Sequence, residues 1–250
     1  MRILLIADIE SKFLWDYYKD EVFTNVDLII SAGDLKSRYL TFLNTVARKR
    51  LLYVAGNHDH RYETDPPLGC DSLDDTILVH NGIRILGLGG SFRYKIGPYQ
   101  YSEKEMQRRI KKLRVLIEQF NGFDILVSHA PASGYGDGDD LCHTGFEVFN
   151  KLIESYHPTY FFHGHQHLNY THKPSRIHHV GMTTYINGYN YFFVDYVHNG
   201  HIRSPKLAIP KLWNTLRFYQ KYHGEQEMKQ YRLYKEFCRN QAILNNKNRL

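Results

Sequence analysis

Cysteine is scarce in this chain of 250 residues: there are three, at positions 70, 142 and 238, and none forms a Cys-x-x-Cys pair. An odd number of isolated cysteines argues against a disulfide framework and for a reducing, cytoplasmic setting. The apolar residues 3–7 are too few for a secretory signal and run straight into Asp8. We therefore interpret residues 3–7 as a first β-strand.

Long apolar runs are also absent. No stretch approaches the roughly 18 consecutive apolar residues that a membrane-spanning helix needs. Internal repeats and low-complexity segments are missing as well. The hydrophobic share of 42% is ordinary for a globular protein. A chain of this length can form one domain with a full core, together with a smaller appendage.

Positive charge is concentrated near the C-terminal end. Residues 205–250 contain ten Lys and Arg against three Glu, a net charge of +7, so the rest of the chain carries −1 of the total of +6. The basic composition belongs to this segment alone, which weakens the argument that the whole protein binds nucleic acid.

The same segment shows helical spacing of apolar and aromatic residues, interrupted at His223-Gly224. We predict a two-helix extension over residues 205–250, appended to a domain of residues 1–204. Three uses of the extension remain open. It packs on the core or forms a homodimer interface, it binds nucleic acid, or it lies on an anionic membrane surface.

Strand-like and helix-like segments alternate along residues 1–204, which predicts a layered α/β domain. Helical spacing marks residues 12–20, 40–48, 102–120 and 146–156. The clearest helix is 102–120, where Ser102 and Glu105 form a capping box. The β-rich stretches 83–88 and 183–197 flank the other strands and suggest a second sheet.

Five short apolar segments each lead into an acid, an amide or a histidine. The residues that follow them are Asp8, Asp34, Asn57-His58-Asp59, His129 and His165-Gln166-His167. Open α/β sheets place their functional sites at the C-terminal ends of strands. We therefore expect these side chains to meet in one site.

These residue types match the needs of phosphate-ester hydrolysis. That reaction requires charge on the phosphoryl oxygens to be offset, water to become hydroxide, and the leaving oxygen to be protonated. Two metal ions about 3.5–4 Å apart achieve the first two. Such ions need a bridging carboxylate together with oxygen and imidazole ligands, and the five strand ends offer a candidate for each.

The five motifs, in this order and each after a strand, resemble the five boxes of the calcineurin-like metallophosphoesterases. The similarity in strand context extends over residues 1–197, and residues 89–94 and 136–140 are similar to a bacterial branch of that family with no settled substrate. The resemblance implies a four-layer α/β sandwich of two mixed β-sheets flanked by helices. It also implies a metal-dependent phosphoesterase in which a metal-bound hydroxide attacks a phosphate mono- or diester substrate.

The resemblance further implies a role for each residue. Asp34 bridges two divalent metal ions. Asp8 and His167 hold the first ion, and the second ion is held by Asn57, His129 and His165. His58 faces the substrate phosphate and assists the leaving oxygen, and Asp59 orients His58.

One position departs from the family pattern. The first box is Asp-x-His in the family, whereas this chain has Asp8-Ile9-Glu10. Side chains alternate along a strand, so Glu10 is expected on the same side as Asp8, in the place of the histidine. A first site of Asp8, Glu10, Asp34 and His167 favours Mn²⁺, Fe or Mg²⁺ over Zn²⁺. The alternative is an altered first site with a weakly bound ion or none.

Two loops carry further candidates for substrate binding. Arg93 and Tyr94 follow Gly89-Gly90, and the guanidinium either grips the substrate phosphate or forms a structural ion pair. His143 ends the glycine-rich stretch 131–143. It either acts on the substrate or fixes the loop through a hydrogen bond.

Two other functions stay open beside the hydrolase. The first is a non-catalytic or single-metal scaffold on the same fold, with the basic extension recruiting a partner. The second is a nuclease-type phosphodiesterase that uses this extension to bind nucleic acid.

Overall fold

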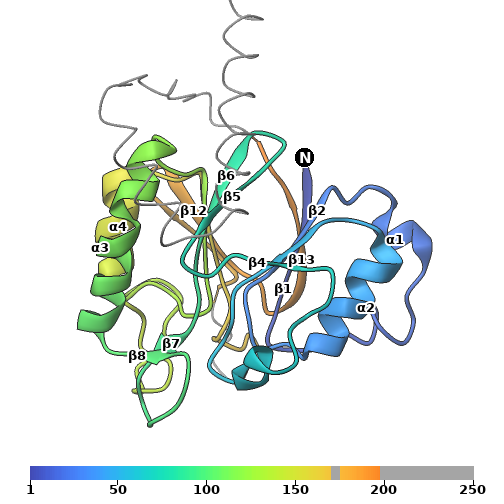
Figure 1. Ribbon diagram of the computed structural model, residues 1–250, viewed down its shortest axis with the longest axis horizontal. Coiled ribbons are helices and arrows are strands. Elements are labelled where there is room, and N and C mark those ends of the chain that lie inside the picture. Colours follow the sequence, from blue (N-terminus) through green and yellow to red (C-terminus); the bar gives the residue numbers. More distant parts are fainter. Residues whose placement is uncertain (170–174, 198–250) are drawn as a thin grey trace, which may run out of the picture.

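Two β-sheets stack face to face, and helices cover the outer face of each sheet (Figure 1). The structure, a computed structural model, describes residues 1–169 and 175–197. The predicted four-layer α/β sandwich of two mixed sheets is confirmed. The two helices predicted over 205–250, and the domain boundary at residue 204, lie outside the described residues.

The first sheet has the strand order β13-β1-β2-β3-β4. Its strands are β1 (Arg2–Ala7), β2 (Leu28–Ser31), β3 (Leu51–Tyr53), β4 (Asp71–Ser72) and β13 (Asn190–Asp195). Strands β1 to β4 run parallel, and β13 pairs antiparallel with β1 at the edge. The central strands are buried on both faces, which explains why their sequences are continuous apolar runs.

The second sheet has the order β11-β12-β10-β9-β6-β5. Its strands are β5 (Ile77–His80), β6 (Ile83–Leu88), β9 (Ile125–Ser128), β10 (Tyr160–His163), β11 (Ile177–Val180) and β12 (Thr183–Asn187). The second sheet suggested by residues 83–88 and 183–197 exists, but its membership differs. Strands β9 and β10 also belong to it, and β13 joins the first sheet. Apolar runs alone do not say which sheet a strand enters.

Within the described residues, four α-helices form the outer layers. Helices α1 (Asp20–Thr24) and α2 (Ser37–Ala47) cover the first sheet, and α3 (Glu103–Gln119) and α4 (Glu147–Tyr156) cover the second (Figure 1). The helices predicted over 40–48, 102–120 and 146–156 are confirmed. The capping box is present in full, because Ser102 and Glu105 each bond the other's backbone N–H.

The helix predicted over residues 12–20 is wrong. Turns occupy residues 12–17, and α1 begins only at Asp20. Trp15 stacks on Tyr39 of α2 and packs against Phe42. The apolar spacing thus reflects a turn that is held against α2 by tertiary packing rather than by a continuous helix.

Side chains along β1 point alternately into two apolar cores. Ile3 and Leu5 belong to the core between the sheets, whereas Leu4 and Ile6 face the core under α1 and α2. All four are completely buried. Burial of each side chain of this size contributes about 1.5–3 kcal/mol, so β1 fixes the position of the site residues that follow it.

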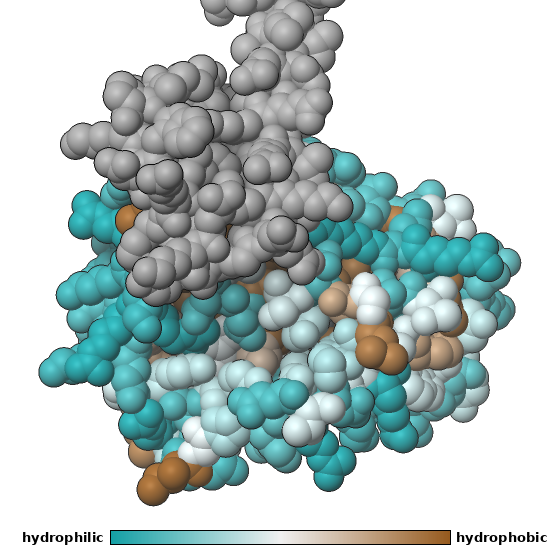
Figure 2. Space-filling model, viewed as in Figure 1, coloured by the Kyte–Doolittle hydropathy of each residue, from teal (hydrophilic) through white to brown (hydrophobic). Residues whose placement is uncertain are grey.

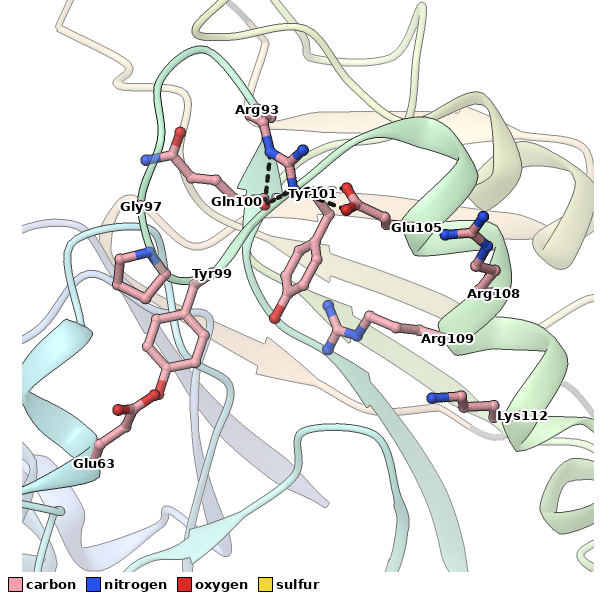
Figure 3. A pocket seen from close by; sticks show the side chains of 11 residues that line it. Glu63, Arg93, Gly97, Tyr99, Gln100, Tyr101, Glu105, Arg108, Arg109 and Lys112 are labelled. Carbon is pink, nitrogen blue, oxygen red and sulfur yellow. Dashed lines mark hydrogen bonds and ion pairs between the residues drawn. The ribbon is translucent and has the colours of Figure 1, made fainter.

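A short parallel pair, β7 (Ser91–Phe92) and β8 (Gln100–Tyr101), stands beside the main sheets. The loop between them carries Arg93 and Tyr99, and β8 leads into α3 (Figure 3). A 3₁₀ helix, η1 (His60–Glu63), lies across from this loop. We call residues 93–99 the rim loop.

The outer surface of the described residues is mostly hydrophilic on the face shown in Figure 2, where apolar residues form small separate groups. Within residues 1–169 and 175–197, no helix combines the length and the apolar character needed to cross a bilayer.

Candidate metal centre

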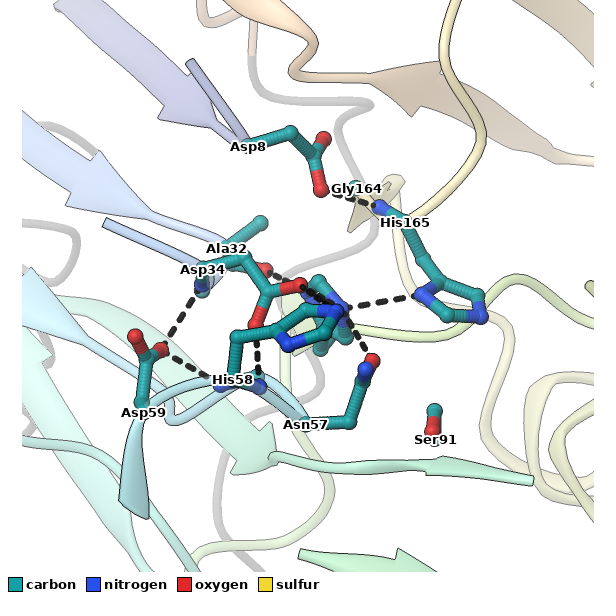
Figure 4. Close-up of polar contacts among 12 residues, drawn as sticks. Asp8, Ala32, Asp34, Asn57, His58, Asp59, Ser91, Gly164 and His165 are labelled. Atoms are coloured by element: carbon teal, nitrogen blue, oxygen red, sulfur yellow. Dashed lines mark hydrogen bonds and ion pairs between the residues drawn. The ribbon is translucent and has the colours of Figure 1, made fainter. Parts of the chain in front are cut away.

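The five strand ends meet at one edge, where the two sheets come together (Figure 4). Strands β1, β2 and β3 of the first sheet lead into Asp8, Asp34 and the loop 56–59. Strands β9 and β10 of the second sheet lead into His129 and His165. Parallel strands place their C-terminal ends at a common edge, so each sheet delivers its polar residues to the same place.

Three of these residues leave their strands in a left-handed backbone conformation. The φ angle is +67° at Asp8, +58° at Asp34 and +67° at His165. Non-glycine residues rarely adopt this conformation, and it costs on the order of 1 kcal/mol or more at each position. The turn at each position ends the strand and redirects the side chain toward the shared edge.

The tightest group contains Asp34, His129 and His165, whose ligand atoms all lie within 4.8 Å of one another. His129 Nε2 is 3.3 Å from Asp34 Oδ2, 3.0 Å from Asn57 Oδ1 and 3.1 Å from His165 Nδ1. The His129 side chain is fully buried. Carboxylate and amide oxygens together with imidazole nitrogens form a donor set that suits a transition metal ion.

Backbone carbonyls orient the two histidines. Ala32 O lies 2.8 Å from His129 Nδ1, and Cys142 O lies 2.6 Å from His165 Nε2. A carbonyl oxygen only accepts hydrogen bonds, so these ring nitrogens carry the protons. In each neutral ring the other nitrogen then offers its lone pair to the shared point, as in metal-ligating histidines.

The charges of this group are coupled. Burial lowers the pKa of His129, but the Asp34 carboxylate outweighs burial and raises the pKa to about 9. Burial likewise raises the pKa of Asp34, but His129 outweighs it and brings the pKa down to about 2. Burial lowers the pKa of His165 to about 3. Asp34 thus draws a positive charge into the site, which a divalent cation supplies in place of the proton on His129.

Asp8 lies on the other side of this group. Its Oδ1 accepts a hydrogen bond of 2.9 Å from the backbone N–H of His165, while its Oδ2 is buried without a hydrogen-bond partner. Burial raises the pKa of Asp8 to about 7. A buried carboxylate oxygen without a partner is costly unless a cation satisfies it. The donor set and this oxygen both fit a metal ion.

Glu10 and His167 are placed differently from the tight group. Glu10 Oε1 is 3.3 Å from Lys36 Nζ, and the His167 ring lies 4.9 Å from that of Tyr189. Within the described residues, no group of three ligand side chains includes Asp8, Glu10 or His167. The alternation expected to carry Glu10 beside Asp8 does not apply, because β1 ends at Ala7 and the chain turns at Asp8.

Asp59 holds the backbone of the site. Its Oδ2 accepts hydrogen bonds of 2.7 Å from the backbone N–H groups of both Asp34 and Gly56. Burial raises the pKa of Asp59 to about 7. The expectation that Asp59 orients the His58 ring finds no hydrogen bond here. The carboxylate fixes the position of Asp34 instead.

His58 stands at the open mouth of the site. Its side chain is 66% exposed, and its Nε2 lies 4.0 Å from Asp34 Oδ2 (Figure 4). Its backbone N–H donates to Asp34 Oδ1 over 2.8 Å. An exposed imidazole beside the buried ligands can reach a molecule that enters from solvent.

Two glycines permit the close packing around Asp34 and His129. A Cβ at Gly56 would lie 2.1 Å from Asp34 Oδ1, and one at Gly33 would lie 2.8 Å from His129 Nδ1. Gly33 also has a φ of +94°. Gly56 is therefore required by its close approach to Asp34, and Gly33 by its positive φ and its close approach to His129 of the other sheet.

The rim residues occupy distinct positions. Tyr94 Oη accepts a hydrogen bond of 3.2 Å from Asn57 Nδ2, which leaves Asn57 Oδ1 facing His129. Arg93 bonds both oxygens of Glu105, at 2.8 and 2.9 Å. Of the two alternatives for Arg93, the structure contains the ion pair.

His143 reaches the site from the glycine-rich stretch. Its Nδ1 lies 2.8 Å from Asp140 Oδ2, and its ring centroid is 5.3 Å from that of His165. Asp140, Cys142 and His143 form a second, more exposed group of close ligand atoms. The hydrogen bond expected to fix the loop is present, and it holds the ring beside the metal centre.

Sequence reasoning missed the carbonyls of Ala32 and Cys142. Every residue carries a carbonyl, so no side-chain pattern marks these two. The Ala32–His129 and Cys142–His165 hydrogen bonds each join residues from separate segments of the chain.

This chain is similar to one protein family and to several proteins of known structure. The sequence model of the calcineurin-like phosphoesterases matches residues 1–169. TT1561 of Thermus thermophilus is 16% identical, with a TM-score of 0.51 over 76% of this chain and 89% of that chain. A 5'-nucleotidase from Candida albicans is 15% identical, with a TM-score of 0.48 over 75% of this chain and 45% of its own. No curated protein matches the sequence. At 16% identity the likeness to TT1561 concerns the fold alone.

Proposed function

Because the chain belongs to the calcineurin-like phosphoesterase family, which is generally one of metal-dependent phosphoester hydrolases, we propose that it hydrolyses phosphate esters at the centre around Asp34. The observation that carries this proposal is the close group of Asp34, His129 and His165, whose ligand atoms all lie within 4.8 Å of one another. The ester is a monoester or a diester, and the assay below distinguishes them.

We propose the following ligand sets for two divalent ions. Asp34 is shared, one ion is held by Asn57, His129 and His165, and the other by Asp8 and His167 with Glu10. Oxygen-rich ligands favour Mn²⁺ or Fe. Ions held there offset charge on the phosphoryl oxygens and lower the pKa of water.

The remaining side chains act on the substrate or on the ligands. His58, at the mouth of the site, donates a proton to the leaving oxygen. Tyr94 orients the Asn57 amide, and Asp59 holds the backbone of Asp34 in place. Ala32 and Cys142 keep the two histidines in the ring orientation that suits metal ligation.

The direct test measures hydrolysis of p-nitrophenyl phosphate and bis(p-nitrophenyl) phosphate by the full chain, loaded with Mn²⁺. We expect metal-dependent turnover of one ester in preference to the other. His58→Ala should lower kcat by about 10²-fold or more with unchanged metal content. Loss of metal from this variant would instead make His58 a ligand.

A single-metal or non-catalytic centre is the second candidate, and the Glu10–Lys36 contact favours it. With Glu10 turned to Lys36, the first ion lacks one of its expected ligands. Metal analysis of the purified chain separates the two: two equivalents support the dinuclear hydrolase. One equivalent, with no turnover of either ester by folded protein, supports the alternative.

A further inference from the structure

A pocket beside the rim loop is lined by residues other than those of the proposed metal centre (Figure 3). Its volume is about 510 Å³, within the range of small-molecule sites. The lining residues come from η1, from residues 97–101 and from the first half of α3, together with Arg93. None of the proposed metal ligands lines it, so its occupant is not explained by phosphate-ester hydrolysis.

Positive charge dominates the lining. Arg93, Arg108, Arg109 and Lys112 face Glu63 and Glu105. Two of the cations are already paired. Arg93 lies 2.8 Å from Glu105, and Arg109 Nη2 lies 2.9 Å from Asp75 and 3.8 Å from Asp74. Arg108 and Lys112 are then the two further cations of the lining, against the single carboxylate of Glu63, so the pocket keeps a net positive charge.

Arg108 and Lys112 are suited to bind an anion together. They stand four residues apart on α3, and side chains at this spacing share one face of a helix. Both are exposed, and neither has an ion-pair partner within the part of the chain that the structure describes. Two like charges one turn apart repel each other. A phosphate group between them removes that repulsion and accepts charge-assisted hydrogen bonds from both.

The opposite side of the pocket is aromatic. Figure 3 shows the rings of Tyr99 and Tyr101 on one side and Arg108 and Lys112 on the other. The Arg109 guanidinium lies over the Tyr101 ring, 4.3 Å from its centroid, and covers that face of the ring. Tyr99 is partly buried against the core under α1 and α2, and the rest of its side chain lines the pocket as a second aromatic surface.

We propose that this pocket binds a nucleotide, with its phosphates on Arg108 and Lys112 and its base against Tyr99. A bare phosphate uses only one end of a cavity this large, whereas a nucleotide carries both an anionic and a flat aromatic part. Aromatic side chains stack on bases of any kind, because every base has a π-face. The proposal does not depend on hydrolysis at the metal centre.

The test uses isothermal titration calorimetry on the full chain in buffer with EDTA, because diphosphonates chelate Mn²⁺ and would also bind metal ions at the centre around Asp34. The probes are α,β-methylene-ADP, methylenediphosphonate and adenosine. We expect the nucleotide analogue to bind more tightly than methylenediphosphonate, and adenosine to bind below detection. Arg108→Ala/Lys112→Ala should weaken the nucleotide analogue by about tenfold or more, since two charge-assisted contacts are lost.

The matched control is Lys104→Ala/Lys111→Ala, which removes two exposed cations of the same helix that do not line the pocket. It should bind the analogue as the unmodified chain does. Alanine favours helix at all four positions, so both variants keep α3. Equal affinity in the Arg108/Lys112 variant and the unmodified chain, or no binding of the analogue at all, would overturn the proposal. Methylenediphosphonate binding as tightly as the analogue would overturn the placement of a base on Tyr99.

Discussion

The two halves of the metal centre differ in how far the protein alone assembles them. Around His129, the ligand atoms of Asp34, Asn57 and His165 already lie within 3.0 to 3.3 Å of its Nε2. On the other side, Asp8 Oδ2 is buried without a partner, and Glu10 contacts Lys36. The half around His129 is organised by hydrogen bonds and backbone carbonyls. In the half around Asp8, the side chains of Asp8, Glu10 and His167 form no such group within the described residues.

This contrast shows what holds a ligand in place before a metal binds. His129 is fixed because its other ring nitrogen is bonded to Ala32. Such outer contacts commonly change metal affinity by about 10–100-fold. Glu10 has an outer contact too, but its partner Lys36 is a cation, which would compete with an ion in the proposed centre.

The largest expected effect follows from Asp34→Asn. In the proposed centre Asp34 is shared by both ions, so the variant should lose both and lower esterase activity by about 10³-fold or more. Asp8→Asn should lose only the ion held with Asp8. Metal content by mass spectrometry, measured on both variants in parallel, checks this order. Retention of both ions by Asp34→Asn would remove Asp34 from the shared position.

Gly56→Ala should break the organised half without removing a ligand. Its Cβ would lie 2.1 Å from Asp34 Oδ1, so the carboxylate must shift. Misplacement by about 1 Å can cost about 10²-fold in kcat. The control is Gly97→Ala, whose Cβ meets only the Gln100 side chain at 3.3 Å. Normal kcat in Gly56→Ala would show that the close approach of Gly56 to Asp34 is not needed for turnover.

Substitutions of Glu10 and Lys36 test the half around Asp8 directly. Glu10→Gln should weaken the ion held with Asp8 by about tenfold, and Lys36→Met should strengthen it, because the competing cation is gone. Competition with a chromophoric chelator measures both affinities. Affinities unchanged by either substitution would place Glu10 outside the metal centre.

The smallest expected effect is a change with pH in the free energy of unfolding of the metal-free protein. Burial raises the pKa of Asp8 from 3.8 to about 7. A carboxyl with a raised pKa binds its proton more tightly in the folded state, so the folded state loses stability as pH rises from about 4 to about 7. Over that window Asp8 lowers the free energy of unfolding by about 1 kcal/mol per pH unit.

The comparison variant is again Asp8→Asn, which cannot ionise. In the metal-free state its stability relative to the unmodified chain should increase as pH rises through this window, as measured by urea unfolding. Added Mn²⁺ should stabilise the unmodified chain more than the variant. A stability difference that is independent of pH would show that Asp8 ionises freely in the folded protein.

Local sequence patterns predicted most of the fold. Helix α3 begins at Ser102 because its capping box with Glu105 is a contact three residues apart. The segment 12–20 was misjudged because Trp15 packs on α2, which lies outside the segment itself. Apolar spacing reports which residues are buried, but not the element against which they pack.

The candidate site was predicted in its residues more fully than in its contacts. The five strand ends could be found because each pairs an apolar run with metal-ligand residue types. The contacts of Asp59 with Asp34 and Gly56 could not be found, because its partners are backbone N–H groups. Glu10 could not be placed because alternation assumes an extended backbone, and the chain turns at Asp8.

The sequence by itself determined the layered α/β class, the order of the strand ends and the types of ligand that they carry. These features depend on hydrophobicity, capping and residue chemistry, which act over a few residues. Only the tertiary structure decided which sheet each strand joins, that Glu10 contacts Lys36, and that Arg108 and Lys112 face Tyr99 across a pocket. These outcomes depend on packing between segments far apart in the chain, where the position of one side chain is set by all of its neighbours at once.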